Sequence, residues 1–124
     1  MSDTGASTGG FAAYGVTRRR EDQTIVLSVT GALDILTAGD FTQDLLAAIG
    51  EAPQAVIVDM SRLDFLASAG MSALVEGHRA AGPGTKLAVV ADGPATSRPL
   101  TITGLTELIA LYPTLADAVT DLGA

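Results

Sequence analysis

The sequence predicts a single α/β domain, built on a mixed, mainly parallel sheet of about four to five strands with about four helices packed on it. The chain has 124 residues, the length of one ordinary domain. Segments rich in β-branched residues alternate with segments whose apolar residues recur at helical spacing. Hydrophobic residues make up 48% of the chain, enough to fill a core. We expect residues 1–10 to form a flexible tail and residues 11–124 to form the domain.

The first two strands are expected to form a hairpin. They cover Phe11–Thr17 and Thr24–Thr30, and the polar segment Arg18–Gln23 lies at the tip. Because basic residues at an exposed turn are usually solvated, we assign no function to the three arginines of this tip. Three further strands are predicted from short apolar runs, and they cover Ala55–Asp59, Lys86–Ala91 and the edge strand Leu108–Leu111.

Helices are predicted between these strands. Thr37 and Asp40 resemble a capping box that opens a helix over about Ala38–Ile49. After a surface segment over Met60–Leu66, a second helix is expected to begin at Ser68. Its apolar row contains Met71, Leu74, Val75 and His78. Two short helices complete the chain, one entered through Ser97 and Arg98 with Pro99 in its first turn, and one capped by Thr114 and Asp117.

Composition excludes several classes of function. The chain has no cysteine and one histidine, which excludes disulfides and the usual Cys/His zinc sites. Seven basic residues against fourteen acidic ones give a net charge of −7, which argues against nucleic acid as a direct partner. Neither a secretory signal nor an apolar run long enough to span a membrane is present, so we expect a soluble, cytoplasmic protein that makes no membrane contact.

Catalytic machinery is not apparent either. Asp59 ends a predicted central strand, as the acceptor of a phosphorylated receiver domain would. However, the acidic pair and the lysine after the last core strand that such chemistry needs are missing. Asp59 is therefore expected to make turn hydrogen bonds to the loop that follows it. No phosphate-binding loop is present, and His78 is expected to pack on its helix. We predict a protein that is not an enzyme, with no catalytic residue, no metal and no cofactor.

The segment from Phe65 to Met71 attracts most interest, because Ser68 stands in it at the expected N-cap of the second helix. The small residues Ala67, Ala69 and Gly70 would leave the hydroxyl reachable and would permit close approach of another protein. A helix N-terminus also favours a phosphate group. Capping and phosphorylation are two possible roles for Ser68, and they can coexist.

The residues of Val56–Met71 resemble the signature of STAS domains, specifically those of bacterial anti-sigma-factor antagonists. That signature is a hydrophobic strand, an Asp, a short loop, a Phe and a serine-containing turn that opens a helix. The turn Gly31–Asp34 and the pair Gly104-Leu105 match two further, weaker elements of the family.

The resemblance implies a binding switch. Members bind an anti-sigma factor, which is an ATP-binding serine kinase, and so release a sigma factor. Phosphorylation of the serine ends the interaction. Carried over to this chain, Ser68 is the phosphoacceptor, and the partner-binding residues are Asp34, Ala67, Ser68, Ala69, Gly70 and Met71.

This chain departs from the family at two positions of the turn. Ala67 replaces an Asp and Ala69 replaces a second serine, so only Ser68 can accept a phosphate there. The alternative interpretation is a STAS scaffold or ligand-sensing module in a bacterial signalling complex, in which Ser68 is not phosphorylated.

Overall fold

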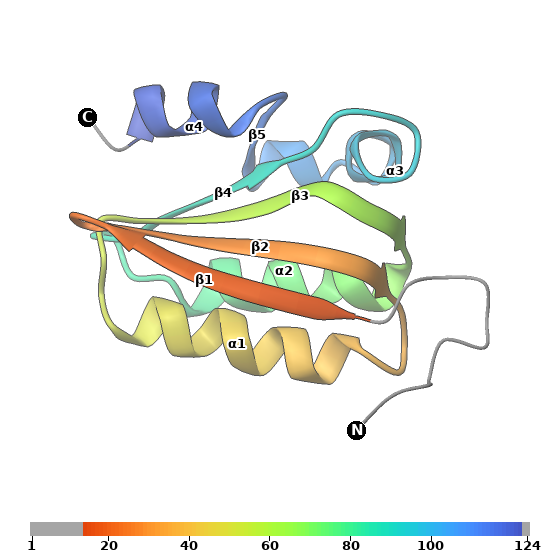
Figure 1. Cartoon of the computed structure of the whole chain (residues 1–124), viewed down its shortest axis with the longest axis horizontal. Coiled ribbons are helices and arrows are strands. Elements are labelled where there is room, and N and C mark those ends of the chain that lie inside the picture. The colour runs from red at the N-terminus through yellow and green to blue at the C-terminus, as the bar shows by residue number, and fades with distance from the viewer. Residues whose placement is uncertain (1–13, 123–124) are drawn as a thin grey trace.

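The computed structural model describes residues 14–122 (Figure 1). The expected tail, residues 11–13 of the first expected strand and the last two residues lie outside this range. Five strands form one sheet: β1 Gly15–Glu21, β2 Thr24–Leu33, β3 Ala55–Leu66, β4 Lys86–Val90 and β5 Ala110–Tyr112. Four α-helices accompany it: α1 Ala38–Gly50, α2 Ser68–Ala80, α3 Ser97–Ile102 and α4 Leu115–Leu122. A 3₁₀ turn over Leu105–Glu107 precedes β5.

The strands follow one another across the sheet in chain order. β1 is antiparallel to β2, and β2 to β5 are parallel neighbours. The predicted mixed, mainly parallel sheet is therefore confirmed, and so is the hairpin formed by the first two strands. Because parallel neighbours need crossover connections, helices lie between consecutive parallel strands.

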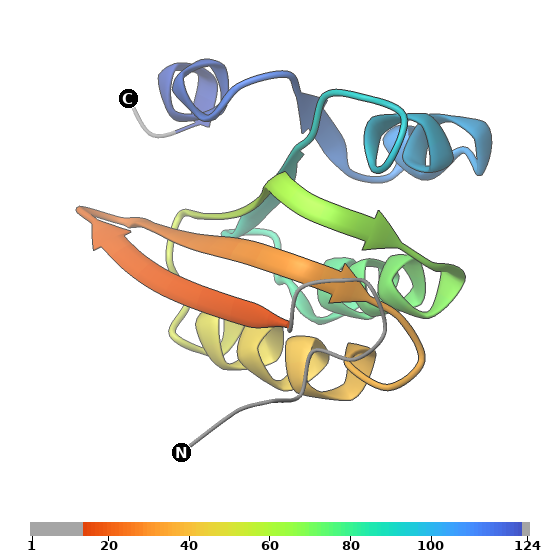
Figure 2. The same ribbon diagram turned by 45° about the vertical axis from the view of Figure 1, so that its right-hand side comes forward.

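Helices lie on both sides of the sheet. Figures 1 and 2 show α1 and α2 side by side on one face, with α4 on the other. Leu100 of α3 belongs to the core that lies under α1 and α2. The larger core lies under α1 and α2 and contains alternate residues of β2 such as Ile25 and Leu27, together with Phe41 of α1. On the opposite face, Val26 and Ile57 pack against Ala118 of α4. Burial on both faces explains why Ala55–Val58 is a continuous apolar run.

β2 and β3 are both longer than the sequence predicts. β3 continues through Met60–Leu66, where the sequence predicts a surface segment. β2 includes Gly31–Leu33, where the sequence predicts a turn after the strand. The pairing of β2 with β3 shifts register twice, between Ser28 and Thr30 and between Gly31 and Ala32. Such bulges break the two-residue alternation by which a strand is recognised in a sequence.

The predicted helix ends are partly correct. Thr37 is the N-cap of α1, but its side chain makes no capping bond, so the expected capping box is absent. In α4 the expected cap is present, because the Asp117 N–H donates to Thr114 Oγ1 at 3.1 Å. Pro99 lies in the first turn of α3 as expected. His78 is exposed and not packed on an apolar face, since Gly77 is the residue of α2 that faces α1.

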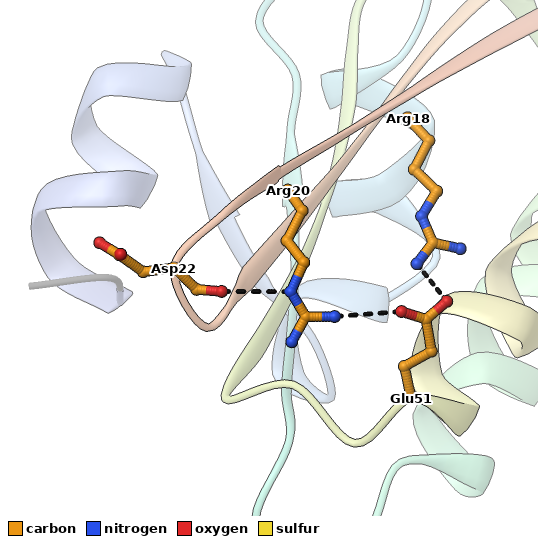
Figure 3. A network of polar contacts seen from close by, with 4 residues as sticks. All are labelled: Arg18, Arg20, Asp22 and Glu51. Carbon is orange, nitrogen blue, oxygen red and sulfur yellow. Dashed lines mark hydrogen bonds and ion pairs between the residues drawn. The ribbon is translucent and has the colours of Figure 1, made fainter.

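The arginines of β1 make ion pairs, which corrects the expectation that they are only solvated. Arg18 and Arg20 point to the α1 side of the hairpin, where both bind Glu51 at the end of α1 (Figure 3). The Arg20 guanidinium also donates from Nε to the Asp22 carbonyl at 3.2 Å. Arg19 points to the opposite face, since neighbouring residues of a strand alternate, and it pairs with Glu21. The alternation therefore splits one basic run between two faces.

This arginine–carboxylate cluster predicts a small dependence of stability on pH. The hydrogen bond from Arg18, together with the charges of Arg18 and Arg20, holds the pKa of Glu51 below its ordinary value. Because the folded state favours the carboxylate, the cluster stabilises the fold at neutral pH, and this contribution is lost as the pH falls through the lowered pKa. We expect Glu51→Gln to lower the thermal midpoint slightly at about pH 7 and to flatten its fall toward about pH 3, because such exposed pairs are weak. Identical acid profiles for variant and parent would contradict the assignment.

Candidate functional site

The candidate site lies where β2 and β3 end together. Leu33 and Leu66, the last residues of the two strands, are in register. The Ala67 N–H donates to the Leu33 carbonyl at 2.8 Å, which extends the pairing by one step. Asp34 and Ala67 therefore leave the same edge of the sheet next to each other, as we expected for Asp34 and the Ser68 turn.

Asp34 organises the turn between β2 and α1. Its Oδ1 accepts hydrogen bonds from the backbone N–H groups of Leu36, at 2.9 Å, and Thr37, at 3.2 Å. Its own N–H donates to Thr37 Oγ1 at 3.0 Å, and that hydroxyl donates to the Ala32 carbonyl at 2.8 Å. Asp34 thus has a structural role through Oδ1. Its second carboxylate oxygen has no hydrogen-bond partner within residues 14–122 and remains open to a ligand.

Ser68 is the first residue of α2, and its side chain is exposed. The N-cap is Ala67, with the extended backbone of φ −93° and ψ 171°, and no side chain caps this end. The expectation that Ser68 is the N-cap is therefore wrong by one position. The Ala67 carbonyl accepts from the Gly70 N–H at 3.0 Å and from the Met71 N–H at 3.2 Å, so the first turn is closed by backbone alone. Within the described chain the Ser68 hydroxyl has no partner.

The first turn of α2 contributes no negative charge of its own. No acidic residue stands in the first turn, and the N–H groups of Ser68 and Ala69 have no intrahelical acceptor. The positive end of the helix dipole therefore points toward the exposed Ser68. A phosphate on this hydroxyl would lie at the helix end, where an anion is most favoured.

Gly70 faces the interior and not the surface. A β-carbon on Gly70 would lie 2.8 Å from Leu66 Cδ1 and 2.9 Å from Leu33 Cβ, and the residue is buried. Its missing side chain lets α2 pack directly on the ends of β2 and β3. Gly70 therefore has a packing role, and its expected place in the partner-binding surface stays a prediction. Ala67, Ala69 and Met71 are half-buried around Ser68 and keep an accessible part.

Apolar side chains that the sequence analysis did not single out surround this edge. Ile35 and Leu36, in the turn held by Asp34, are 81% and 86% exposed. Phe65, the second-to-last residue of β3, is 41% exposed. Because large apolar groups are rarely left so exposed together, they indicate an interaction surface. We call Asp34, Ile35, Leu36, Phe65 and Ser68 the β2–β3 edge surface. The sequence did contain a signal for this surface. Ile35 and Leu36 directly follow Asp34, and they belong to no apolar pattern of a strand or a helix.

Two kinds of feature are not present in residues 14–122. That part of the chain contains no group of three or more His, Cys, Asp or Glu side chains that could hold a metal ion. It also contains no helix that is both long and apolar enough to cross a membrane.

The site thus combines an exposed serine that opens a helix with exposed apolar side chains, at the end of two parallel strands of a small α/β domain. The family model of the STAS domain matches residues 16–118. The chain belongs to the STAS domain family.

Two relatives are similar in sequence. The anti-sigma-F factor antagonist RsfB of Mycobacterium tuberculosis is 35% identical over 95 residues, which cover 77% of this chain and 78% of that protein. A crystal structure of an anti-sigma factor antagonist from Mycobacterium paratuberculosis is 37% identical, with a TM-score of 0.87, and the match covers 90% of this chain and 96% of that one.

A more distant structure shares the fold alone. The anti-sigma factor antagonist SpoIIAA in its unphosphorylated form matches with a TM-score of 0.70 at 18% identity, over 90% of this chain and 98% of that one. The predicted fold class and the predicted family are thus both confirmed.

Proposed function

We propose that this chain is an anti-sigma-factor antagonist, a regulatory protein and not an enzyme. It binds an anti-sigma factor of the ATP-binding serine-kinase type through the β2–β3 edge surface and so releases a sigma factor. Phosphorylation of Ser68 ends the interaction. The relatives named above as antagonists support the class of function.

The observation that carries the proposal is the juxtaposition of an unpartnered serine hydroxyl with exposed apolar side chains. Ile35 and Leu36 offer area that a partner can bury, and Ser68 is available to a kinase because no capping bond restrains it. Asp34 holds the turn that presents both apolar residues, and its second carboxylate oxygen, which has no partner within the described residues, offers a further contact. Ala67, Ala69 and Met71 complete the surroundings of Ser68.

Phosphorylation can end such an interaction without refolding the domain. A phosphoserine adds close to two negative charges. Burying an unpaired charge against apolar side chains such as Leu36 costs several kcal/mol, whereas about 2.7 kcal/mol already weakens binding a hundredfold.

The test is a binding measurement with candidate anti-sigma factors from the organism that encodes this chain. Truncating both exposed apolar residues, in Ile35→Ser with Leu36→Ser, is expected to lower the affinity at least about tenfold, because each buried aliphatic side chain contributes about 1.5–3 kcal/mol. The stability should hardly change, since neither side chain packs in the core.

Leu108→Ser is the matched control. Leu108 is 53% exposed but follows the 3₁₀ turn beside β5, away from the end of β2. Its loss should leave the affinity unchanged. Equal binding by the double variant and the parent would place the interface elsewhere and contradict the proposed surface.

A further inference from the structure

The sheet carries a second surface feature, on the face opposite α1 and α2. There α4 contacts β3, β4 and β5 and packs on Val26 of β2, so β1 and the rest of β2 are left without a helix on this face (Figure 2). A groove of about 430 Å³ lies between this uncovered part and Leu115 of α4. Its volume lies within the range of small-molecule sites, which is roughly 300–1,000 Å³.

Hydroxyl groups form the floor of the groove. Thr17, Ser28, Thr30 and Ser61 line it, and Thr17 and Ser28 face each other across β1 and β2. Thr30 donates to the Gly15 carbonyl over a long 3.5 Å. The hydroxyls of Thr17, Ser28 and Ser61 have no hydrogen-bond partner within residues 14–122. A sheet face meant to be buried by a helix would carry apolar side chains at these positions, as Val26 does under α4.

Two arginines and one carboxylate provide the charge. Arg19 reaches the groove from β1 and Arg62 from β3, on either side of β2. Arg19 uses only Nε for its pair with Glu21, and Arg62 has no ion pair with any described residue. The lining itself contains two basic side chains and one acidic side chain, and Glu21 balances Arg19 from outside the lining. Guanidinium groups that keep free N–H donors are suited to phosphate oxygens.

Asp59 makes the site selective for a ligand that also carries hydroxyl groups. Its Oδ1 accepts from the Ser61 N–H at 3.0 Å, a bond that lies inside β3 and not in the loop that we expected after Asp59. The other carboxylate oxygen has no partner within the described residues. A carboxylate repels an anion but accepts a hydrogen bond from a hydroxyl. The groove thus combines donors for a phosphate with acceptors and donors for alcohol groups.

We propose that this groove binds a small phosphorylated polyhydroxy compound of the sugar-phosphate class. The guanidinium groups of Arg19 and Arg62 hold the phosphate, and Asp59 with the neighbouring hydroxyls holds the alcohol groups. The proposal goes beyond the Ser68 switch, because the groove lies on the sheet face and not at the β2–β3 edge surface.

The experiment is an NMR titration of the ¹⁵N-labelled chain with glucose 6-phosphate, ribose 5-phosphate and glycerol 3-phosphate. We expect saturable shifts of the β1, β2 and β3 amides with at least one of these. Glucose alone and inorganic phosphate alone should each bind at least about tenfold more weakly. Arg62→Gln should weaken binding about tenfold, whereas Arg79→Gln, at an exposed arginine in the last turn of α2, should not.

Each outcome decides the proposal. Absence of saturable shifts with all three phosphates overturns it, and so does equal affinity for inorganic phosphate, which would show a simple anion site. Unchanged affinity of Arg62→Gln also overturns it. Ser68→Ala should bind the sugar phosphate as the parent does, so failure of the Ser68 switch and failure of this site can be told apart.

Discussion

Ser68→Asp is expected to lower the affinity for the anti-sigma factor by at least about a hundredfold, which corresponds to about 2.7 kcal/mol. The carboxylate would enter the β2–β3 edge surface, which contains Ile35 and Leu36 and no basic residue. Burying an unpaired charge in the interface removes its hydrating water, and no partner group offsets that cost. Isothermal titration calorimetry with the parent and the variant measures the effect.

The stability of the fold should rise in Ser68→Asp, although the affinity of this variant for the anti-sigma factor falls. Because Ser68 is the first helical residue and makes no capping bond, Ser68→Ala should change the free energy of unfolding by only a few tenths of a kcal/mol. Ser68→Asp should stabilise the fold by about 0.3–1 kcal/mol, since the carboxylate interacts with the free N–H groups and the dipole of α2. Ser68→Ala should bind like the parent and should resist the kinase. If Ser68→Asp also binds like the parent, the proposed switch is excluded.

Gly70→Ala is expected to give the largest loss of stability among the single variants considered. The new β-carbon would lie 2.9 Å from Leu33 Cβ, an atom that cannot rotate away, and 2.8 Å from Leu66 Cδ1. Overpacking of this kind costs about 1–3 kcal/mol, and we expect the upper end, about 3 kcal/mol. The better helix propensity of Ala offsets about 1 kcal/mol, which leaves a net loss of about 2 kcal/mol. Urea unfolding measures this loss directly.

Gly39→Ala provides the matched control for that variant. Gly39 also lies in a helix, but a β-carbon there would meet nothing within 4 Å. The substitution should stabilise the fold by up to about 1 kcal/mol through helix propensity alone. Equal stability changes at Gly70 and Gly39 would contradict the close packing of α2 on the sheet.

The sequence predicted correctly those strands and helices in which the positions of the apolar residues reflect which side chains are buried. Ala55–Val58 is buried on both faces, so its apolar run identified β3, and the apolar spacing of α1 follows from Phe41 and Leu45 in the core. The continuation of β3 to Leu66 was missed, because the two bulges place buried residues three apart. That spacing is not the period of a strand.

The candidate site was predicted in its residues but not in their roles. Ser68 and Asp34 lie at the same edge because Leu33 pairs with Leu66, and the resemblance to STAS domains led us to expect this proximity. Local pattern alone could not show that Ala67 takes the N-cap position. Nor could it show that Gly70 turns inward, because this depends on how α2 packs over Leu33 and Leu66. Exposure of Ile35 and Leu36 likewise follows from the path of the Asp34 turn.

Phosphorylation of the intact chain by its anti-sigma factor tests the central claim most directly. The purified protein is incubated with candidate anti-sigma factors and Mg·ATP, intact mass and peptide mapping locate any phosphate, and binding is measured before and after the reaction. We predict a single phosphate on Ser68, together with an affinity at least about a hundredfold lower. Ser68→Ala serves as the control that should remain unmodified and bound. Unchanged mass with a factor that binds the chain, or phosphate at another residue, would contradict the account.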